Sequence, residues 1–252
     1  MTGIALVTGG QQGIGFGISR ALLAAGFQVA MASRSAPEKP AVKNALAALG
    51  PNAVYVQHDV SDIDNVSSCL DQVEAQLGPV TALVSNAGVG APVRGDMLDL
   101  QPENWDFVQN INLRGAFFLA QEVARRMLAQ PQNTYRSITF VTSVSATMVS
   151  VERAEYCVSK AAAAMMAQLF AVRLAPHGIG VFELRPGIIA TEMTEGVREK
   201  YTDRIEGGLV PAARWGEARD IGSVIVPIAE GKLEFATGAA IPVDGGLSIS
   251  RL

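Results

Sequence analysis

Short runs of apolar residues alternate along the chain with longer segments in which apolar residues recur at every third or fourth position. Seven short runs predict buried strands, at Ile4–Thr8, Gln28–Ala32, Val54–Gln57, Val80–Ser85, Ser137–Thr142, Gly180–Leu184 and Ala239–Val243. Six longer segments have the spacing of one helix face, at Gly13–Ala25, Val42–Leu49, Ile63–Leu77, Pro102–Ala129 with a break near Asn112 and Gly115, Ala154–Ala175 and Ile221–Ala229.

Strands that are apolar throughout and alternate with helices are typical of a parallel sheet covered on both faces. We therefore expect an α/β protein with one domain over residues 1–252. Its Rossmann fold would be a doubly wound, seven-stranded parallel sheet with helices on both faces. Ligands bind such sheets beyond the carboxyl ends of the strands. The polar and charged segment 187–215 is expected to lie over that edge as a lid.

Composition narrows the class of protein. The chain has 252 residues, of which 49% are hydrophobic, and a net charge of −4 without a basic run. A nucleic-acid partner is therefore not expected. Cys69 and Cys157 do not suggest a disulfide framework, and no signal peptide is visible, so we expect a reducing cytoplasm. No uninterrupted apolar run reaches the roughly 18–20 residues of a membrane span. His58 and His177 lack ligand-spaced partners, so no metal site is expected.

A glycine-rich loop follows the first strand and opens the first helix. It reads Thr8-Gly9-Gly10-Gln11-Gln12-Gly13-Ile14-Gly15. Glycines let a backbone turn tightly and approach a pyrophosphate, and the helix N-terminus offers free N–H groups and a partial positive charge. The loop therefore predicts a dinucleotide site, although an ordinary strand–helix turn can have the same composition.

The candidate residues for proton transfer are Ser143, Tyr156 and Lys160. Tyr156 and Lys160 are separated by four positions and share one helix face, while Ser143 follows a predicted strand. A nearby ammonium stabilises a phenolate, so such a tyrosine can exchange a proton with an alcohol or a carbonyl oxygen. A serine hydroxyl aimed at the same oxygen would fix its position. By itself, the pair also fits a half-buried tyrosine beside a snorkelling lysine.

Together these motifs resemble the compact form of the short-chain dehydrogenase/reductase family. The similarity runs from Thr2 to about Gly246 and includes Asn86-Ala87-Gly88, Asn112 and Arg185-Pro186-Gly187-x₃-Thr191. The resemblance implies hydride transfer between a nicotinamide and a carbonyl or carbinol carbon. Tyr156 would be the general acid in reduction and the base in oxidation. Lys160 would assist Tyr156 and bind the nicotinamide ribose, Ser143 would orient the substrate oxygen, and Asn112 would hold a water that passes protons.

The resemblance also implies a set of cofactor contacts. These are Gly9, Gln11, Gln12, Gly13, Ile14, Gly15, Ser33, Arg34, Asp59, Val60, Asn86, Ala87, Gly88, Tyr156, Lys160, Pro186, Gly187, Ile189 and Thr191. Asp59-Val60 would contact the adenine, although it also fits a helix-capping loop. The second strand ends in Ala32-Ser33-Arg34-Ser35 and has no carboxylate for a ribose 2′-OH. Arg34 can instead bind a 2′-phosphate, with help from the hydroxyls of Ser33 and Ser35.

We therefore expect NADP(H) to be preferred, with NAD(H) also usable. The departure from the pattern is Gln12, at a loop position where many NADP-using relatives have a basic residue.

The substrate is the least constrained part of the prediction. The pattern resembles 3-oxoacyl-thioester reductases of fatty-acid synthesis (3-oxoacyl-acyl-carrier-protein reductases) and also polyol and sugar dehydrogenases. We expect a ketone–alcohol oxidoreductase, with a 3-oxoacyl thioester as the first candidate and a polyol or sugar as the alternative. A non-catalytic dinucleotide-binding protein is a remote third interpretation. Candidate substrate contacts are Ser145, Arg94, Met148 and Arg153. The two arginines could meet an anionic or hydroxyl-rich molecule or could be surface residues.

Partners follow from the resemblance. Relatives commonly form homotetramers through the long helices after the fourth and fifth strands, so we expect a homotetramer with no membrane association. A carrier protein would need a basic docking surface. Arg125 and Arg126 could serve, but His177 stands where well-known carrier-protein reductases have a second docking arginine.

Overall fold

The computed structural model describes residues 3–131 and 133–251, and it has the predicted parallel sheet. Its strands are β1 (Ile4–Thr8), β2 (Gln28–Ser33), β3 (Ala53–Gln57), β4 (Ala82–Ser85), β5 (Arg136–Val141), β6 (Ile179–Pro186) and β7 (Ala240–Val243). They form one 7-stranded sheet in the order β3-β2-β1-β4-β5-β6-β7, and every pair is parallel. The expected fold class is confirmed, with strand ends that differ from the prediction by one or two residues.

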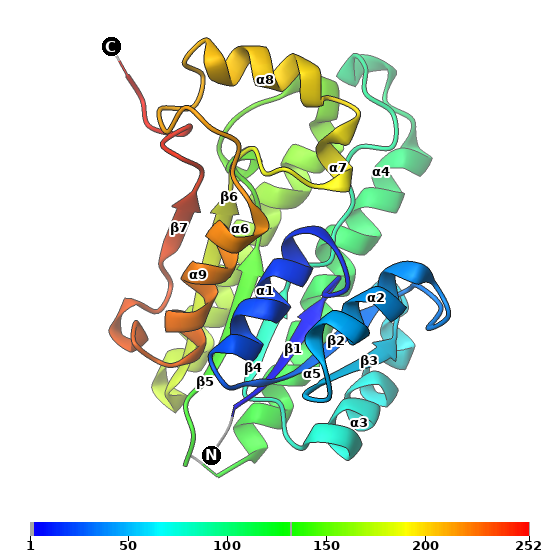
Figure 1. Ribbon diagram of the computed structural model, residues 1–252, viewed down its shortest axis with the longest axis vertical. Coiled ribbons are helices and arrows are strands. Elements are labelled where there is room, and N and C mark those ends of the chain that lie inside the picture. Colours follow the sequence, from blue (N-terminus) through cyan, green and yellow to red (C-terminus); the bar gives the residue numbers. More distant parts are fainter. Residues whose placement is uncertain (1–2, 132, 252) are drawn as a thin grey trace.

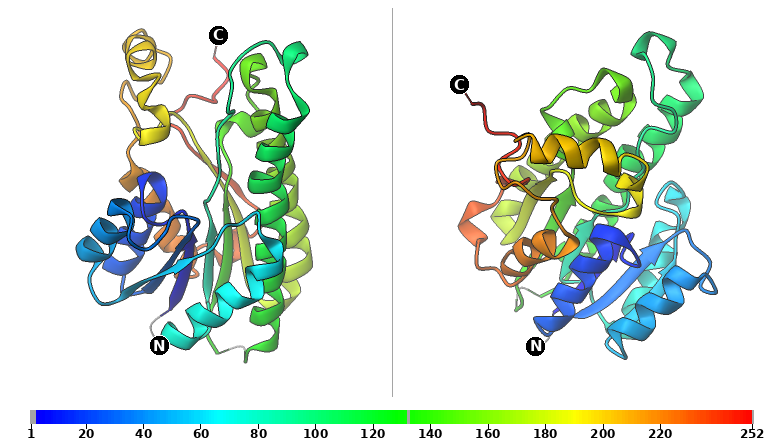
Figure 2. Two further views of the ribbon diagram at one scale, coloured as in Figure 1. Left: turned by 90° about the vertical axis from the view of Figure 1, so that its right-hand side faces the viewer. Right: turned by 45° about the horizontal axis from the view of Figure 1, so that its top comes forward.

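Helices cover both faces of the sheet (Figures 1 and 2). One layer contains α1 (Gly13–Ala24), α2 (Pro40–Leu49) and α9 (Ala218–Ala229). The other contains α3 (Val66–Leu77), α4 (Pro102–Gln109), α5 (Ala116–Ala129) and α6 (Ala154–Leu174). This two-sided cover explains why the strands are apolar throughout rather than in alternate positions.

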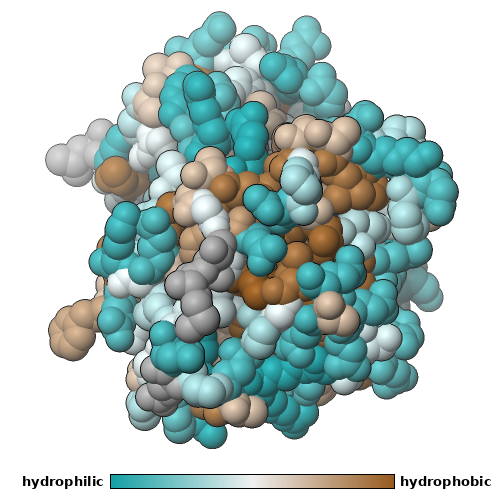
Figure 3. Space-filling model, turned by 60° about the horizontal axis from the view of Figure 1, so that its bottom comes forward, coloured by the Kyte–Doolittle hydropathy of each residue, from teal (hydrophilic) through white to brown (hydrophobic). Residues whose placement is uncertain are grey.

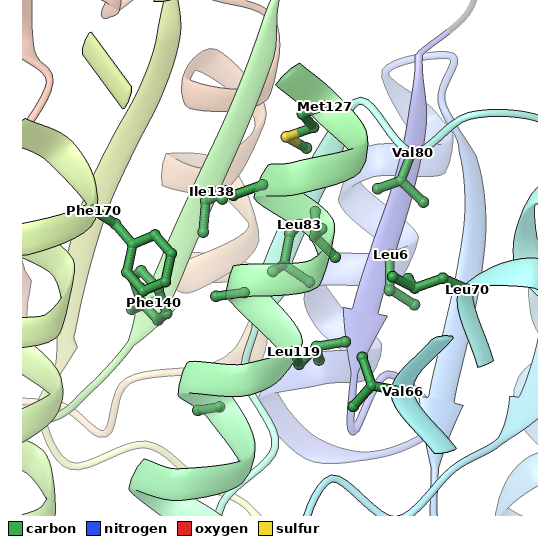
Figure 4. Close-up of a cluster of buried hydrophobic side chains, with 14 of the residues drawn as sticks. Leu6, Val66, Leu70, Val80, Leu83, Leu119, Met127, Ile138, Phe140 and Phe170 are labelled. Carbon is green, nitrogen blue, oxygen red and sulfur yellow. The ribbon is translucent and has the colours of Figure 1, made fainter. Parts of the chain in front are cut away.

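The core divides into two clusters, one on each face of the sheet. Successive strand residues point to opposite faces, so Leu6 belongs to the cluster under α3, α5 and α6, and Val7 to the cluster under α1, α2 and α9. Figure 4 shows the first cluster, in which Leu83 and Ile138 of the sheet lie beside α5, which contributes Leu119 and Met127. Each fully buried side chain of this kind contributes about 1.5–3 kcal/mol to folding.

The predicted break in the long helical region is a π-helical turn. It covers Asn110–Gly115 and joins α4 to α5. At Gly115, an added Cβ would lie 2.1 Å from the carbonyl oxygen of Val60. Only glycine lets the helix approach the turn after β3 this closely. The wider turn leaves Asn112 buried beneath the edge of the sheet where the motifs gather.

One helical stretch in the described part of the chain is long and apolar enough to cross a membrane by composition. It is Val151–His177, which contains α6 and has a mean hydropathy of 1.3. Half of that window is buried inside the protein. The stretch therefore behaves as a core helix that covers a sheet.

The expected lid forms two short helices, α7 (Glu192–Glu195) and α8 (Arg198–Glu206). Both lie beyond the carboxyl ends of the strands, at the top of Figure 1. A Thr191 capping box begins α7, and the indole of Trp215 donates a 3.1 Å hydrogen bond to Thr202 Oγ1 of α8. The opposite end of the molecule, turned to the viewer in Figure 3, is largely hydrophilic around one hydrophobic patch.

Candidate active site

The parallel sheet brings the sequence motifs to one edge. The glycine loop follows β1, Asn86 follows β4, Ser143 follows β5 and Asp59 comes two residues after β3. Carboxyl ends of parallel strands all lie at the same edge, so these segments, which are far apart in the sequence, become neighbours.

Tyr156 and Lys160 lie on the first turns of α6, as the sequence predicted. The Lys160 side chain is buried, and its Nζ donates a 3.2 Å hydrogen bond to the carbonyl oxygen of Val141 at the end of β5. The same Nζ lies 5.6 Å from the centroid of the Tyr156 ring. The ammonium is therefore held beside the phenol ring on which the predicted proton exchange depends.

Ser143 caps a short 3₁₀ turn, Val144–Ala146, that packs against α6. Its Oγ accepts a 3.1 Å hydrogen bond from the backbone N–H of Ser145. In the described part of the chain the Ser143 hydroxyl donates to no protein group, so its hydrogen remains available to a substrate oxygen.

Asn112 joins the turn after β4 to α6. Its Oδ1 accepts from Val89 N at 2.8 Å, and its Nδ2 donates to Val89 O at 2.9 Å and to Ser159 Oγ at 3.1 Å. Both hydrogens of the side-chain amide are thus used in holding these segments together, and its oxygen accepts one bond. The role of Asn112 in proton passage stays a prediction, and the structure brings it beside Gly88 and Lys160.

The glycine loop fits a dinucleotide pyrophosphate. A Cβ on Gly15 would lie 2.1 Å from the carbonyl oxygen of Gly9, so the loop folds over the start of α1 only with glycine there. Gln12 precedes α1 without a side-chain cap, which leaves N–H groups free for an anion. Gln11 is buried and its Oε1 has no partner among the described residues. The free N–H groups match an anionic ligand, and the unpartnered Gln11 oxygen matches a hydroxyl or N–H donor on the same ligand.

Thr8 ties this loop to the Asn86-Ala87-Gly88 turn. Its Oγ1 accepts hydrogen bonds from Asn86 N and Ala87 N, both at 2.9 Å. The Asn86 amide in turn donates to Thr8 O at 2.8 Å. The ends of β1 and β4 therefore form one rigid unit at the centre of the sheet.

The segment that follows β6 also lies close to the glycine loop. Pro186 ends β6, Gly187 lies against Asp244, and Ile189 is buried and forms a bridge with Gly216. Thr191 approaches the loop, because its Cγ2 lies 3.5 Å from the Cβ position of Gly13.

The residues predicted to contact the adenine side of a dinucleotide lie at the ends of β2 and β3. Arg34 is exposed, whereas Ser33 is buried. Asp59 Oδ1 accepts from Ser61 N at 2.9 Å and from Ser61 Oγ at 2.7 Å. Burial alone would raise the pKa of Asp59, but these hydrogen bonds and the charge of Arg34 hold it below its usual range. These two bonds form a local turn and do not cap a helix, because Asp62 and Asn65, which precede the two helical segments that follow, make no side-chain cap bond.

Ser33 differs from its expected role. Its Oγ lies 2.7 Å from the hydroxyl of Tyr55 and accepts from Ser35 N at 3.3 Å. The hydroxyl is therefore used inside the protein, and this arrangement does not support a direct bond from Ser33 to a 2′-phosphate.

The substrate candidates divide into two groups. The Arg153 guanidinium lies 5.3 Å from the centroid of the Tyr156 ring, and its Nη2 donates to the buried Ser145 Oγ at 3.4 Å. The structure therefore brings Arg153 and Ser145 to the reaction centre. Arg94 and Met148 lie in exposed segments instead.

One network was missed from the sequence. Glu183 of β6 is buried, accepts a 2.6 Å hydrogen bond from Thr142 Oγ1 and pairs with Arg185 at 2.7 Å. Hydrogen bonding to Glu183 raises the pKa of Arg185. The signal was two charged residues within an apolar strand, which are costly to bury unless paired. Because Thr142 precedes Ser143, this network supports the end of β5 beneath the site.

Comparisons with known proteins agree with this geometry. The family model described as "Enoyl-(Acyl carrier protein) reductase" matches residues 9–248. The 3-oxoacyl-[acyl-carrier-protein] reductase MabA of Mycobacterium tuberculosis is 34% identical over 249 residues, which cover 98% of this chain and 93% of that protein.

Two solved structures are similar over almost their whole lengths. A 3-oxoacyl-[acyl-carrier protein] reductase from Brucella melitensis in complex with NAD has a TM-score of 0.96 and 46% identity, and the match covers 100% of this chain and 99% of that one. A gluconate 5-dehydrogenase from Burkholderia cenocepacia in complex with NADP and tartrate has a TM-score of 0.90 and 28% identity, with 99% and 96% covered.

Proposed function

The chain belongs to the short-chain dehydrogenase/reductase family and is an oxidoreductase that acts on CH–OH groups, and on that premise we propose an NADP(H)-dependent reductase of 3-oxoacyl thioesters. The observation that carries the proposal is Tyr156 beside the buried Lys160 ammonium, at the edge of the sheet that also holds the glycine loop. The proposed proton donor and the proposed dinucleotide site therefore lie at the same edge of the sheet.

In reduction, the Tyr156 hydroxyl donates its proton to the ketone oxygen, and in oxidation it takes the proton from the alcohol. Lys160, fixed by the Val141 carbonyl, stabilises the phenolate that remains. Ser143 Oγ accepts a hydrogen bond from Ser145 N, and its own hydrogen points to the same substrate oxygen. A bound nicotinamide dinucleotide supplies or accepts the hydride.

NADP(H) is favoured by the residues at the end of β2. Arg34 follows the strand, no carboxylate stands there to accept a ribose 2′-OH, and the Arg34 charge acts on neighbouring Asp59. The two solved structures named above hold NAD in one case and NADP in the other. NAD(H) is therefore proposed as the weaker, usable cofactor.

A 3-oxoacyl thioester is favoured as substrate by the 34% and 46% identical reductases. The matching family model is described as an enoyl reductase. In the proposed reaction, however, Ser143 hydrogen-bonds a substrate carbonyl oxygen and Tyr156 protonates it. We therefore propose carbonyl reduction rather than reduction of a carbon–carbon double bond.

A sugar acid or polyol is the second candidate, and Arg153 favours it. None of the ion pairs in the described part of the chain involves Arg153 or Lys160. Two cations without carboxylate partners thus flank the Tyr156 ring. A carboxylate close to the reacting carbon would neutralise this charge, whereas a thioester would not.

Carrier-protein docking receives only partial support. Arg126 is held by Asp71, Glu74 and Glu122 between α3 and α5, at 2.8, 2.9 and 3.2 Å, so it is not free for a partner. Arg125 is exposed and makes only a 3.6 Å pair with Glu122. Small thioesters are therefore the better first test of the substrate.

A cytoplasmic homotetramer without membrane contact remains part of the proposal. Large apolar side chains are exposed along α4, α5 and α6, namely Phe107, Phe118, Met165, Leu169 and Val172. Monomeric proteins rarely leave such a row uncovered. Pairing of these helices with a second copy would bury it, and light scattering would show a mass near four times 26.5 kDa.

Initial rates with NADPH and a short 3-oxoacyl thioester, run beside gluconate with NADP⁺, test the function. If the first proposal is right, kcat/KM for the thioester should exceed kcat/KM for gluconate by at least about 10-fold. The reverse order would favour the second candidate. NADPH binding with no turnover of either substrate would support a protein that only binds the dinucleotide.

A further inference from the structure

The turn between β2 and α2 is shaped by one tyrosine of the neighbouring strand. Tyr55 lies on β3, opposite Met31 of β2, and packs on the α2 side of the sheet. Its hydroxyl oxygen is 2.7 Å from Ser33 Oγ, 2.9 Å from the Ser33 carbonyl oxygen and 2.5 Å from the Ser35 carbonyl oxygen. Three groups of the turn therefore meet at a single side-chain atom.

The hydrogens of this cluster have a definite arrangement. Carbonyl oxygens only accept, so the one hydrogen of Tyr55 goes to the carbonyl oxygen of Ser33 or Ser35. The Ser33 hydroxyl must then donate to Tyr55, and it accepts from Ser35 N at 3.3 Å. Ser33 has no hydrogen left for a ligand, whereas the Ser35 hydroxyl makes no hydrogen bond in the described part of the chain.

Arg34 is fixed between these anchored residues. Its carbonyl oxygen accepts a 3.2 Å hydrogen bond from Gln57 Nε2, again from β3. Its charge contributes to lowering the pKa of Asp59, which follows β3. The backbone on both sides of Arg34 is thus tied to β3, and the guanidinium acts on the edge of the sheet where the adenine side of a dinucleotide would lie.

We infer that Tyr55 is a positioning residue for cofactor choice: its hydroxyl holds the Ser33–Ser35 turn in the shape that presents Arg34 and the Ser35 hydroxyl to a ribose 2′-phosphate. The inference rests on the proposed function, in which Arg34 selects NADP(H). A turn that is already ordered loses less conformational entropy when the ligand binds. Removal of the Tyr55 hydroxyl should therefore weaken ligands that carry a 2′-phosphate and spare those that lack it.

Burial raises the pKa of Tyr55 despite the opposing hydrogen bond from Ser33, so the hydroxyl remains protonated at neutral pH. Tyr55→Phe removes this group and keeps the ring that packs against α2. Tyr135→Phe is the matched control. The Tyr135 hydroxyl is buried without a hydrogen-bond partner in the described structure, and Tyr135 precedes β5, at the opposite end of the sheet from the Ser33–Ser35 turn.

The test is equilibrium binding of adenosine 2′,5′-bisphosphate and adenosine 5′-monophosphate to the whole protein, measured by calorimetry. Tyr55→Phe should weaken the bisphosphate about 10-fold and the monophosphate less than about 2-fold. Tyr135→Phe should change neither. Since Arg34 supplies the charge that binds the 2′-phosphate, Tyr55→Phe should weaken bisphosphate binding much less in the Arg34→Ala background than in the wild type.

The outcomes separate this inference from the cofactor proposal. Equal affinity of the wild type for both nucleotides would overturn the NADP(H) proposal and the inference with it. A preference that Arg34→Ala removes but Tyr55→Phe leaves intact would keep the cofactor proposal and overturn the role of Tyr55. Equal weakening of both nucleotides in Tyr55→Phe would also overturn it, since that marks a general structural role.

Discussion

The two halves of the site are held in different ways. On the dinucleotide side, Thr8 joins two strand ends through 2.9 Å hydrogen bonds, and Gly15 allows backbone contact that no other residue permits. On the substrate side, Arg153 is held by two hydrogen bonds of 3.4 Å, and the neighbouring Val149 is 89% exposed. The first half is closely fitted around Thr8 and Gly15, and the second is more open around Arg153.

This difference indicates where each property of the enzyme resides. Residues that place the dinucleotide and the proton donor are fixed by groups on several strands, so substitutions there should affect every reaction. Arg153 is held by long hydrogen bonds beside exposed residues, so substitutions there should change substrate preference and leave cofactor binding intact.

The largest effect is expected at Gly15 on the closely fitted side. In Gly15→Ala the new Cβ would lie 2.1 Å from Gly9 O and 2.7 Å from Asn86 Nδ2, so the loop must shift. NADPH affinity should fall at least about 100-fold in fluorescence titration. Gly95→Ala, where an added Cβ meets nothing within 4 Å, is the control and should bind normally. Comparable NADPH affinity in Gly15→Ala and Gly95→Ala would contradict the close fit inferred for the dinucleotide side.

A smaller and selective effect is expected at Arg153. Arg153→Gln removes the cation above Tyr156 while a polar side chain remains, so kcat/KM for an anionic hydroxy acid should fall about 10-fold. The rate with a neutral thioester should change less than about 3-fold, and NADPH affinity should be unaffected. Arg94→Gln, in the exposed loop, is the matched control. A loss of NADPH affinity in Arg153→Gln would contradict the division between the halves.

The smallest effect concerns pH and lies at the outer edge of the dinucleotide side. Burial lowers the pKa of His58, against the opposing charges of Asp62 and Asp59. The folded protein therefore resists protonation that the unfolded chain accepts below about pH 6.5. This contribution to stability is present above that value and is lost as the pH falls. The Tm of the wild type should drop more between pH 7.5 and 5.5 than that of His58→Gln, whereas equal drops would contradict this assignment.

The sequence was sufficient for the sheet and for the chemical motifs. Apolar runs located β1 to the residue, and the spacing of Tyr156 and Lys160 placed both on one helix. Both features depend on neighbours within a few positions, where periodicity is informative.

The features that the sequence did not reveal depend on pairs of distant residues. Tyr55 reaches Ser33 across 22 positions, and Arg126 reaches Glu74 across 52. The break near Asn112 was predicted, but its π-helical form was not, because it follows from the approach of Gly115 to Val60. Such contacts require knowledge of which strands and helices become neighbours.

The central claim is that Tyr156 transfers the proton while the dinucleotide side works independently of it. The most direct test is the rate of NADPH oxidation with a short 3-oxoacyl thioester by the wild type and Tyr156→Phe, with NADPH affinity measured on both. The account predicts a loss of kcat of at least about 1000-fold and a Kd for NADPH within about 2-fold of the wild type. A wild-type rate in Tyr156→Phe would contradict it.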